Sequence, residues 1–156
     1  MLTSRRDYLL RIIDEVGRML ARVIFQREKG RQQDALQSVV QACERLFGLE
    51  ADKLFQFSPD QHFAMLAEGE TPEAARDKIL LYAALNTEAG RVYRELANPT
   101  MANVSLLNAL RFTLKAEKAF PREGWPAFAP SVEELGKLLQ GIPLDPETTE
   151  LMRERS

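Results

Sequence analysis

The stretch LLRIIDEVGRMLARVIF, residues 9–25, decides the fold class of this chain. Its large apolar side chains recur at spacings of three and four, which is the period of one face of an α-helix. They are Leu9, Ile12, Ile13, Val16, Leu20, Val23 and Ile24. The pattern predicts a long amphipathic helix from about residue 5 to residue 27. On its other side, Arg11, Arg18 and Arg22 share one narrow stripe, because their spacings are seven and four.

The helical period continues along the chain, and start and stop signals separate the segments. They predict helices over 32–47, 58–69, 71–96, 102–120 and 131–140, a single turn or two within 49–57, and a last helix from residue 145. Pairs such as Ser58-Pro59 and Thr71-Pro72 mark helix starts, because the first residue caps the helix and proline presets the backbone of its first turn. No segment of useful length alternates as a strand does. The sequence therefore predicts an all-α fold of antiparallel helical hairpins.

The length of 156 residues favours one domain. We expect residues 1–121 to form a helical array and residues 122–156 to form a proline-rich segment and two short helices that pack on it. Trp125 and Phe128 lie among three prolines, so their rings are expected to insert into the core.

The composition excludes several classes of protein. With 45% hydrophobic and 28% charged residues the chain is typical of a soluble globular protein. The net charge of −2 provides little attraction for nucleic acid or an anionic membrane. No apolar stretch reaches the length of about 18 residues that a membrane-spanning helix needs, and charges interrupt the N-terminal apolar run too early for a signal peptide. We expect a cytoplasmic protein without a membrane span.

The reactive side chains predict no catalytic or metal site. Cys43 and His62 are the only residues of their types, which excludes an internal disulfide and leaves too few ligands for structural zinc. Apolar neighbours predict that Cys43 is a buried, inert thiol, and no nucleophile accompanies His62. Glu133 and Glu134 follow Ser131 as a capping box rather than as a catalytic pair of carboxylates. We therefore predict no enzyme activity, no cofactor and no metal.

Charge is distributed unevenly along the chain. Residues 1–31 contain eight basic and four acidic side chains, and the remainder contains thirteen and nineteen. The stripe of Arg11, Arg18 and Arg22 is therefore a candidate surface for an acidic partner. The alternative is a solvated face neutralised by neighbouring acids. Nucleic acid is not expected to bind, because exposed aromatics do not accompany the arginines.

A weak internal pattern is similar to one tetratricopeptide unit. Gly90 and Tyr93 have the spacing of its first helix, and Ala109, Ala116 and Pro121 match its second, although the segment between Gly90 and Ala109 is longer than in the repeat. Together with Asp7-Tyr8-Leu9-Leu10-Arg11, Gly48-Leu49 and Ser58-Pro59-Asp60, the chain resembles a family of small, uncharacterised bacterial helical proteins over about residues 5 to 121. The resemblance implies a tetratricopeptide-like helical array and no catalytic residue.

Tetratricopeptide folds bind extended peptides in a concave groove, and some hold a terminal carboxylate with asparagine and basic side chains. Asn108, Arg111 and Lys115 share one face of their helix and form a second candidate partner-binding surface. The alternative is a polar outer face.

These observations favour a non-catalytic protein-interaction or scaffold domain with an unidentified protein or peptide partner. The alternative is a small-molecule-binding or enzymatic helical domain, which would need a pocket of convergent polar groups. The first helix also predicts a homodimer, because its apolar residues spread wider than the shorter second helix can cover. Coverage by the segment around Trp125, or by the helix that begins at Ser58, is the alternative to that dimer.

Overall fold

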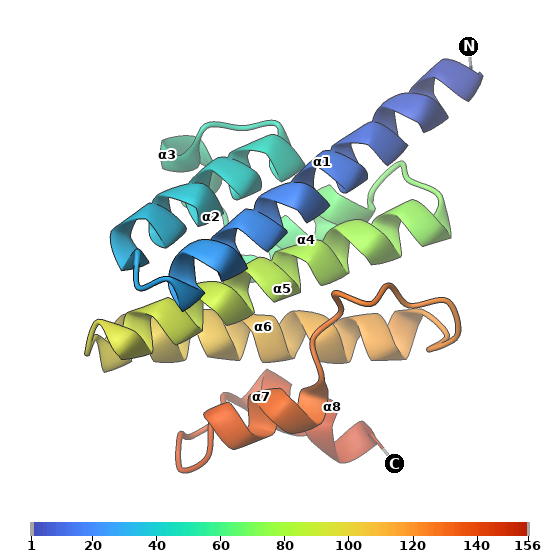
Figure 1. Ribbon diagram of the computed structural model, residues 1–156. Helices are drawn as coiled ribbons and strands as arrows, with labels where there is room; N and C mark the ends of the chain where they lie inside the picture. The colour runs from blue at the N-terminus through green and yellow to red at the C-terminus, as the bar shows by residue number, and fades with distance from the viewer. Residues whose placement is uncertain (1, 156) are drawn as a thin grey trace.

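The computed structural model describes residues 2–155 and is helical throughout its regular parts (Figure 1). The helices are α1 (Leu2–Glu28), α2 (Gln32–Phe47), α3 (Ala51–Leu54), α4 (Pro59–Ala67), α5 (Pro72–Glu95), α6 (Pro99–Ala119), α7 (Val132–Leu138) and α8 (Pro146–Glu154). The described part of the chain contains no strand. The predicted all-α class is thus confirmed.

Helix α5 is the centre of the molecule. It packs against α1, α2 and α4 on one side and against α6 on the other, and α7 and α8 lie on the far side of α6 (Figure 1). The unbroken run of buried residues from Lys78 to Leu85 explains this position, because a helix that is apolar on all sides is stable only between neighbours. Helix α6 was predicted to have neighbours on two faces, and it does.

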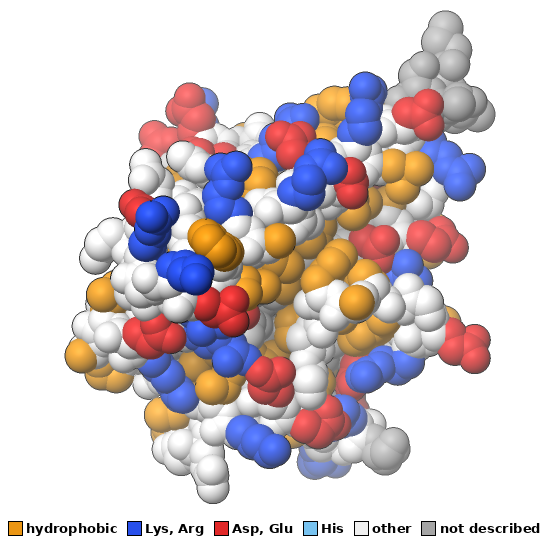
Figure 2. Space-filling view, viewed as in Figure 1, with side chains coloured by type: hydrophobic (Ala, Val, Ile, Leu, Met, Phe, Trp, Pro, Cys, Tyr) orange, Lys and Arg blue, Asp and Glu red, His pale blue; other side chains and the backbone are white. Residues whose placement is uncertain are grey.

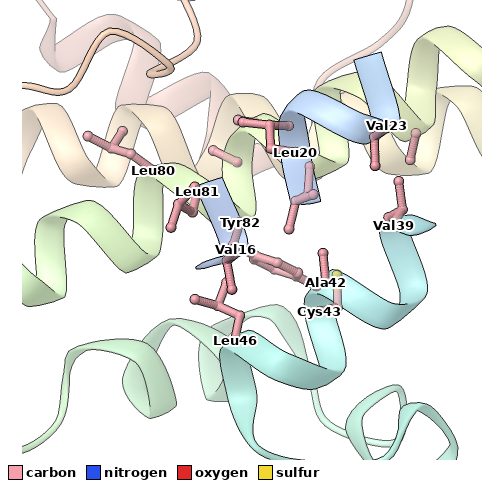
Figure 3. Packing of buried hydrophobic residues seen from close by; sticks show 14 of the residues in the cluster. Val16, Leu20, Val23, Val39, Ala42, Cys43, Leu46, Leu80, Leu81 and Tyr82 are labelled. Atoms are coloured by element: carbon pink, nitrogen blue, oxygen red, sulfur yellow. The ribbon is translucent and has the colours of Figure 1, made fainter. Parts of the chain in front are cut away.

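Helices α1 and α2 form the expected hairpin over α5. Figure 3 shows side chains from all three helices meeting in one core: Val16, Leu20 and Val23 of α1, Val39, Ala42, Cys43 and Leu46 of α2, and Leu80, Leu81 and Tyr82 of α5. Gly48 ends α2 in the left-handed conformation with a φ of 72°, as its position predicted. Trp125 and Phe128 pack against this core, as predicted, but they stay partly exposed rather than fully inserted.

The predicted helix starts are confirmed by their caps. Ser58 and Gln61 form a reciprocal capping box, and Thr71 and Asp145 each accept a hydrogen bond from a backbone N–H of the first turn. Ser131 caps α7 in the same way, but Glu134, the predicted reciprocal partner, forms an ion pair with Arg91 instead.

Helix α6 begins at Pro99 rather than at residue 102. The sequence interpretation treated Asn98-Pro99 only as the end of the preceding helix. Asn98 accepts a hydrogen bond from the backbone N–H of Met101, and Pro99 occupies the first helical position, so the same two residues also start the next helix.

Helices α5 and α6 approach closely where small residues were expected. A Cβ atom added to Gly90 would lie 2.5 Å from Cγ of Leu106, and Ala109 is fully buried. Leu106 and Ala109 belong to a second buried cluster, which joins α6 to Val132 and Leu135 of α7. The two short C-terminal helices therefore pack on α6 through apolar side chains.

Candidate functional site

A groove of about 510 Å³ lies between α2 and α6, with α5 as its floor. We call it the interhelical groove. Its walls and floor are formed by Leu36, Val39, Val40 and Cys43 of α2, by Tyr82, Asn86, Ala89 and Tyr93 of α5, and by Met101, Val104, Ser105, Leu107, Asn108 and Arg111 of α6. Phe55, Phe57, Pro59, His62 and Asp145 complete its lining.

The floor of the groove extends along α5 from Tyr82 to Tyr93. At a rise of 1.5 Å per residue this distance is about 16 Å, or three helical turns. Ala89 lies between the two tyrosines, and its small side chain leaves the floor open. The groove is therefore elongated rather than round.

Large apolar side chains are concentrated at the rim. Eight such residues are exposed in the described part of the chain, and four of them line the interhelical groove: Phe55, Phe57, Met101 and Val104. Val104 is the most exposed, at 58%. Exposed apolar side chains that gather around one hollow mark binding sites for other molecules more often than does a scattered apolar residue.

A chain of polar groups lies in the floor. Nε2 of His62 is 2.7 Å from the carbonyl oxygen of Leu54, and because a carbonyl can only accept, Nε2 carries the proton. The Tyr82 hydroxyl lies 3.4 Å from Nδ1 of the same ring. Burial raises the pKa of Tyr82, so this hydroxyl stays protonated.

Two asparagines form a separate polar contact that joins α5 to α6. Nδ2 of Asn86 donates to the carbonyl oxygen of Tyr82 at 2.9 Å, and Nδ2 of Asn108 lies 3.4 Å from Oδ1 of Asn86. An asparagine amide offers two N–H donors and one oxygen acceptor. Asn108 therefore keeps hydrogen-bonding capacity for a molecule in the groove.

Cys43 is buried, as predicted, and its side chain borders the groove. Burial raises the pKa of the thiol to about 12, so the nucleophilic thiolate is scarce at neutral pH. Both ring nitrogens of His62 already have partners, Leu54 and Tyr82. The histidine is therefore not available as a base for the thiol.

The structure places two of the three predicted α6 residues, Asn108 and Arg111, in the groove. Arg111 is ion-paired with Asp145 at 2.8 Å. Lys115 lies one turn further along and contacts Asp60 at 2.8 Å and Glu147 at 3.1 Å. The side-chain hydrogen bond from Lys115 lowers the pKa of Asp60. Both cations thus connect α6 to its neighbours, and the groove gains no free positive charge from them.

The other predicted set, Arg11, Arg18 and Arg22, lies exposed on the outer side of α1, away from the groove. Arg18 pairs with Asp14 one turn before it. Figure 2 shows Lys and Arg side chains over α1 with Asp and Glu side chains among them. Asp14 thus pairs with one of the three arginines, and a partner-binding role of the stripe stays a prediction.

Sequence reasoning did not assign Tyr82 or Asn86 to a site. Tyr82 was included in the buried stripe of its helix, and Asn86 was not considered. A polar residue within an apolar run was the signal available for Asn86. The role of Asn86 depends on its contact with Asn108 of α6, which lies 22 residues away in the sequence.

Among residues 2–155, no group of histidine, cysteine and acidic side chains could hold a metal ion. Nor is any helix within that range both long and apolar enough to span a membrane. No family model matches the chain, and no curated protein or solved structure is significantly similar to it. The fold and site define an all-helical protein with an elongated, largely apolar groove, and the resemblance to tetratricopeptide-like bacterial proteins stays a prediction.

Proposed function

We propose that this protein is a non-catalytic interaction domain that binds an extended segment of a partner protein in the interhelical groove. The observation that carries the proposal is the combination of an apolar rim with amide groups in the floor. Apolar side chains of the partner would pack between Val104 and Phe55, and its backbone would meet Asn108. We place this role in the cytoplasm, where the thiol of Cys43 stays reduced.

The amide groups favour an extended segment over a helix. Helical backbone groups are already hydrogen-bonded within the helix, whereas an extended segment presents free N–H and C=O groups. The side chain of Asn108 can both donate to and accept from one such peptide group. The floor of about 16 Å corresponds to about five extended residues at 3.3 Å each.

The charges around the groove favour an uncharged segment. Arg111 and Lys115 are already paired with Asp145, Asp60 and Glu147. A charged partner side chain would have to displace one of these pairs. An apolar segment leaves them intact.

A small, mainly apolar molecule is the second candidate. The groove volume of about 510 Å³ lies within the range of about 300 to 1,000 Å³ that small-molecule sites occupy. Such a molecule would contact Asn86 and Tyr82 in the floor and would need no contact with the exposed rim. The exposed rim is the reason that we place this candidate second.

The test selects peptides of about 12 random residues, enough to span the groove and its flanks, from a phage-displayed library on the wild-type protein. Enriched peptides are then synthesised with a fluorophore and titrated by anisotropy. Val104→Asp should weaken their binding at least about tenfold, because it places a charge on the apolar rim. Phe25→Asp is the matched control: Phe25 is 54% exposed on α1, outside the groove, and its replacement should leave binding unchanged.

Enriched peptides that bind both variants as well as the wild type would contradict the groove as the site. If no peptide is enriched, the dye anilinonaphthalene sulfonate, which reports apolar binding sites, tests the second candidate. Dye fluorescence that is enhanced by the wild type and reduced by Ala89→Leu, which narrows the floor, would support the small-molecule function instead.

A further inference from the structure

The N-terminal turns of α1 extend beyond the body of the molecule. Helix α1 has 27 residues and α2 has 16, and the pair Arg45–Glu15 places the last turns of α2 beside the middle of α1. About ten residues of α1, roughly 15 Å of helix, therefore have no α2 beside them. Figure 1 shows this overhang pointing away from the other helices.

A second hollow, of about 640 Å³, lies between this overhang and the start of α5. We call it the N-terminal cleft. One wall carries Arg5, Arg6, Leu9, Leu10 and Ile13 of α1, and the other carries Thr71, Glu73, Ala74 and Asp77. Leu10 is 53% exposed, and its neighbour Tyr8 is 50% exposed.

The remainder of the apolar strip on α1 is covered within the chain. Leu20 is buried, and Ile24 packs in the core beside Phe128 and Ala129 of the proline-rich segment. The predicted alternative, coverage by the segment around Trp125, thus applies to the second half of α1. Of the exposed large apolar side chains on α1, Tyr8 and Leu10 lie at the overhang, and Phe25 lies near the other end of the helix, outside the cleft.

The two walls of the cleft carry opposite charges: Arg5 and Arg6 lie on α1, and Glu73 and Asp77 lie on α5. Arg5 already pairs with Glu70, and Asp77 with Arg76, within the same chain. Figure 2 shows Lys and Arg side chains on the protruding end of α1 and Asp and Glu side chains below them, over the start of α5. Among the side chains that the structure describes, neither Arg6 nor Glu73 has an ion-pair partner.

We propose that the N-terminal cleft is a homodimer interface, in which the α1 overhang of each copy lies in the cleft of the other. A two-fold symmetric interface must be self-complementary, because the same patch faces itself. The cleft meets this condition: its basic wall would face the acidic wall of the second copy, with Leu10 between them. This proposal does not depend on the interhelical groove.

The small size of the patch sets the expected strength. Ten helical residues and the first turns of α5 form an interface at the low end of the range, near about 1,200 Å² in total. We expect a dimer that dissociates in the micromolar range and weakens as salt is added.

The experiment measures mass by light scattering from about 1 to about 200 μM protein, since the mass of a reversible dimer depends on concentration. The wild type should approach twice 17.7 kDa. Leu10→Asp should stay at the monomer mass, whereas Phe25→Asp, on the same helix but outside the cleft, should dimerise as the wild type does. Both changed residues are exposed, so both variants should fold.

Charge reversal tests the geometry itself. Arg6→Glu and Glu73→Arg should each be monomeric, because each homodimer would bring like charges together twice. A mixture of these two variants should dimerise again, because both contacts then join opposite charges. A wild type that stays at 17.7 kDa throughout, or a dimer that Leu10→Asp leaves intact, would overturn the proposal. So would a mixture that remains monomeric.

Discussion

Replacing Gly90 by alanine tests the closest approach of two helices in this protein. In an open helix interior, glycine to alanine stabilises by about 1 kcal/mol. At Gly90 the new Cβ would lie 2.5 Å from Cγ and 2.6 Å from Cδ2 of Leu106. Carbon atoms pack best at about 3.5 to 4.0 Å, so Leu106 or the α5 backbone must move by about 1 Å.

Leu106 has little freedom to move, because it is fully buried against α7. Overpacking of this kind costs about 1 to 3 kcal/mol, which exceeds the gain in helix propensity. We therefore expect Gly90→Ala to lower the free energy of unfolding by up to about 2 kcal/mol. For a chain of 156 residues the unfolding entropy is about 0.33 kcal/mol per kelvin, so the Tm should fall by up to about 6 °C.

The assay is thermal unfolding followed by circular dichroism, with Gly17→Ala as the control. Gly17 lies within α1 and has nothing within 4 Å of its Cβ position, so that variant should gain up to about 1 kcal/mol. The two variants are expected to shift the Tm in opposite directions. A Gly90→Ala protein that melts as high as Gly17→Ala would refute the close approach.

A double-mutant cycle tests whether the loss of stability in Gly90→Ala comes from contact with Leu106. Leu106→Ala removes the two atoms that the new Cβ would meet, and alone it should cost about 2 to 5 kcal/mol. In the Gly90→Ala background it should cost about 1 to 3 kcal/mol less, because removing the Leu106 side chain then also relieves the overlap. Additive effects would show that the strain lies elsewhere.

Two further predictions concern the groove and its rim. Burial raises the pKa of Cys43, the single cysteine, to about 12. We therefore expect the folded protein to react with Ellman's reagent far more slowly than the urea-unfolded chain, and a peptide bound in the groove should slow the reaction further. Equal rates for the folded and the unfolded protein would contradict the burial of Cys43. Burial opposes the charged form of Asp145, but hydrogen bonds from Thr148 and the nearby Arg111 outweigh it and lower its pKa. The stability from this charge is therefore present above the ordinary Asp pKa and is lost as the pH falls. We expect Asp145→Asn to lower the free energy of unfolding by about 0.5 to 1 kcal/mol at pH 7. The difference from wild type should disappear as the pH falls below the ordinary Asp pKa, as measured by melting curves at decreasing pH. A difference that stays constant would assign the effect to side-chain shape.

The helices were predictable because their ends are encoded locally. Ser58, Thr71 and Asp145 each cap a helix within three residues of themselves, and proline follows each one. The missed start of α6 has the same origin. Asn98-Pro99 carries both an end and a start signal, and a local reading that stops at the first signal loses the second.

The interhelical groove depends on residues far apart in sequence, and it was predicted only in part. Asn108 and Arg111 were selected from their shared helix face, which is a local property. The ion pair that Arg111 forms was not predictable, because its partner Asp145 lies 34 residues away in the sequence. Helical periodicity shows which face of α5 is apolar, but whether another helix covers that face, or leaves it as the floor of a groove, depends on the packing of α2 and α6.

The sequence predicts that α1 extends beyond α2, but it does not predict which parts of the apolar face of α1 are covered by the rest of the chain. The difference in length between α1 and α2 can be read from local signals, and it is the origin of the overhang. Local signals do not identify the segment that covers Leu20, because Phe128 lies beyond the first six helices in the sequence. Leu20 belongs to the same apolar strip of the sequence as Leu9 and Ile13, but it is only 4% exposed in the folded protein. A charge there would unfold the core and abolish a dimer whatever its interface, whereas a charge at Leu10 distinguishes loss of the interface from loss of the fold.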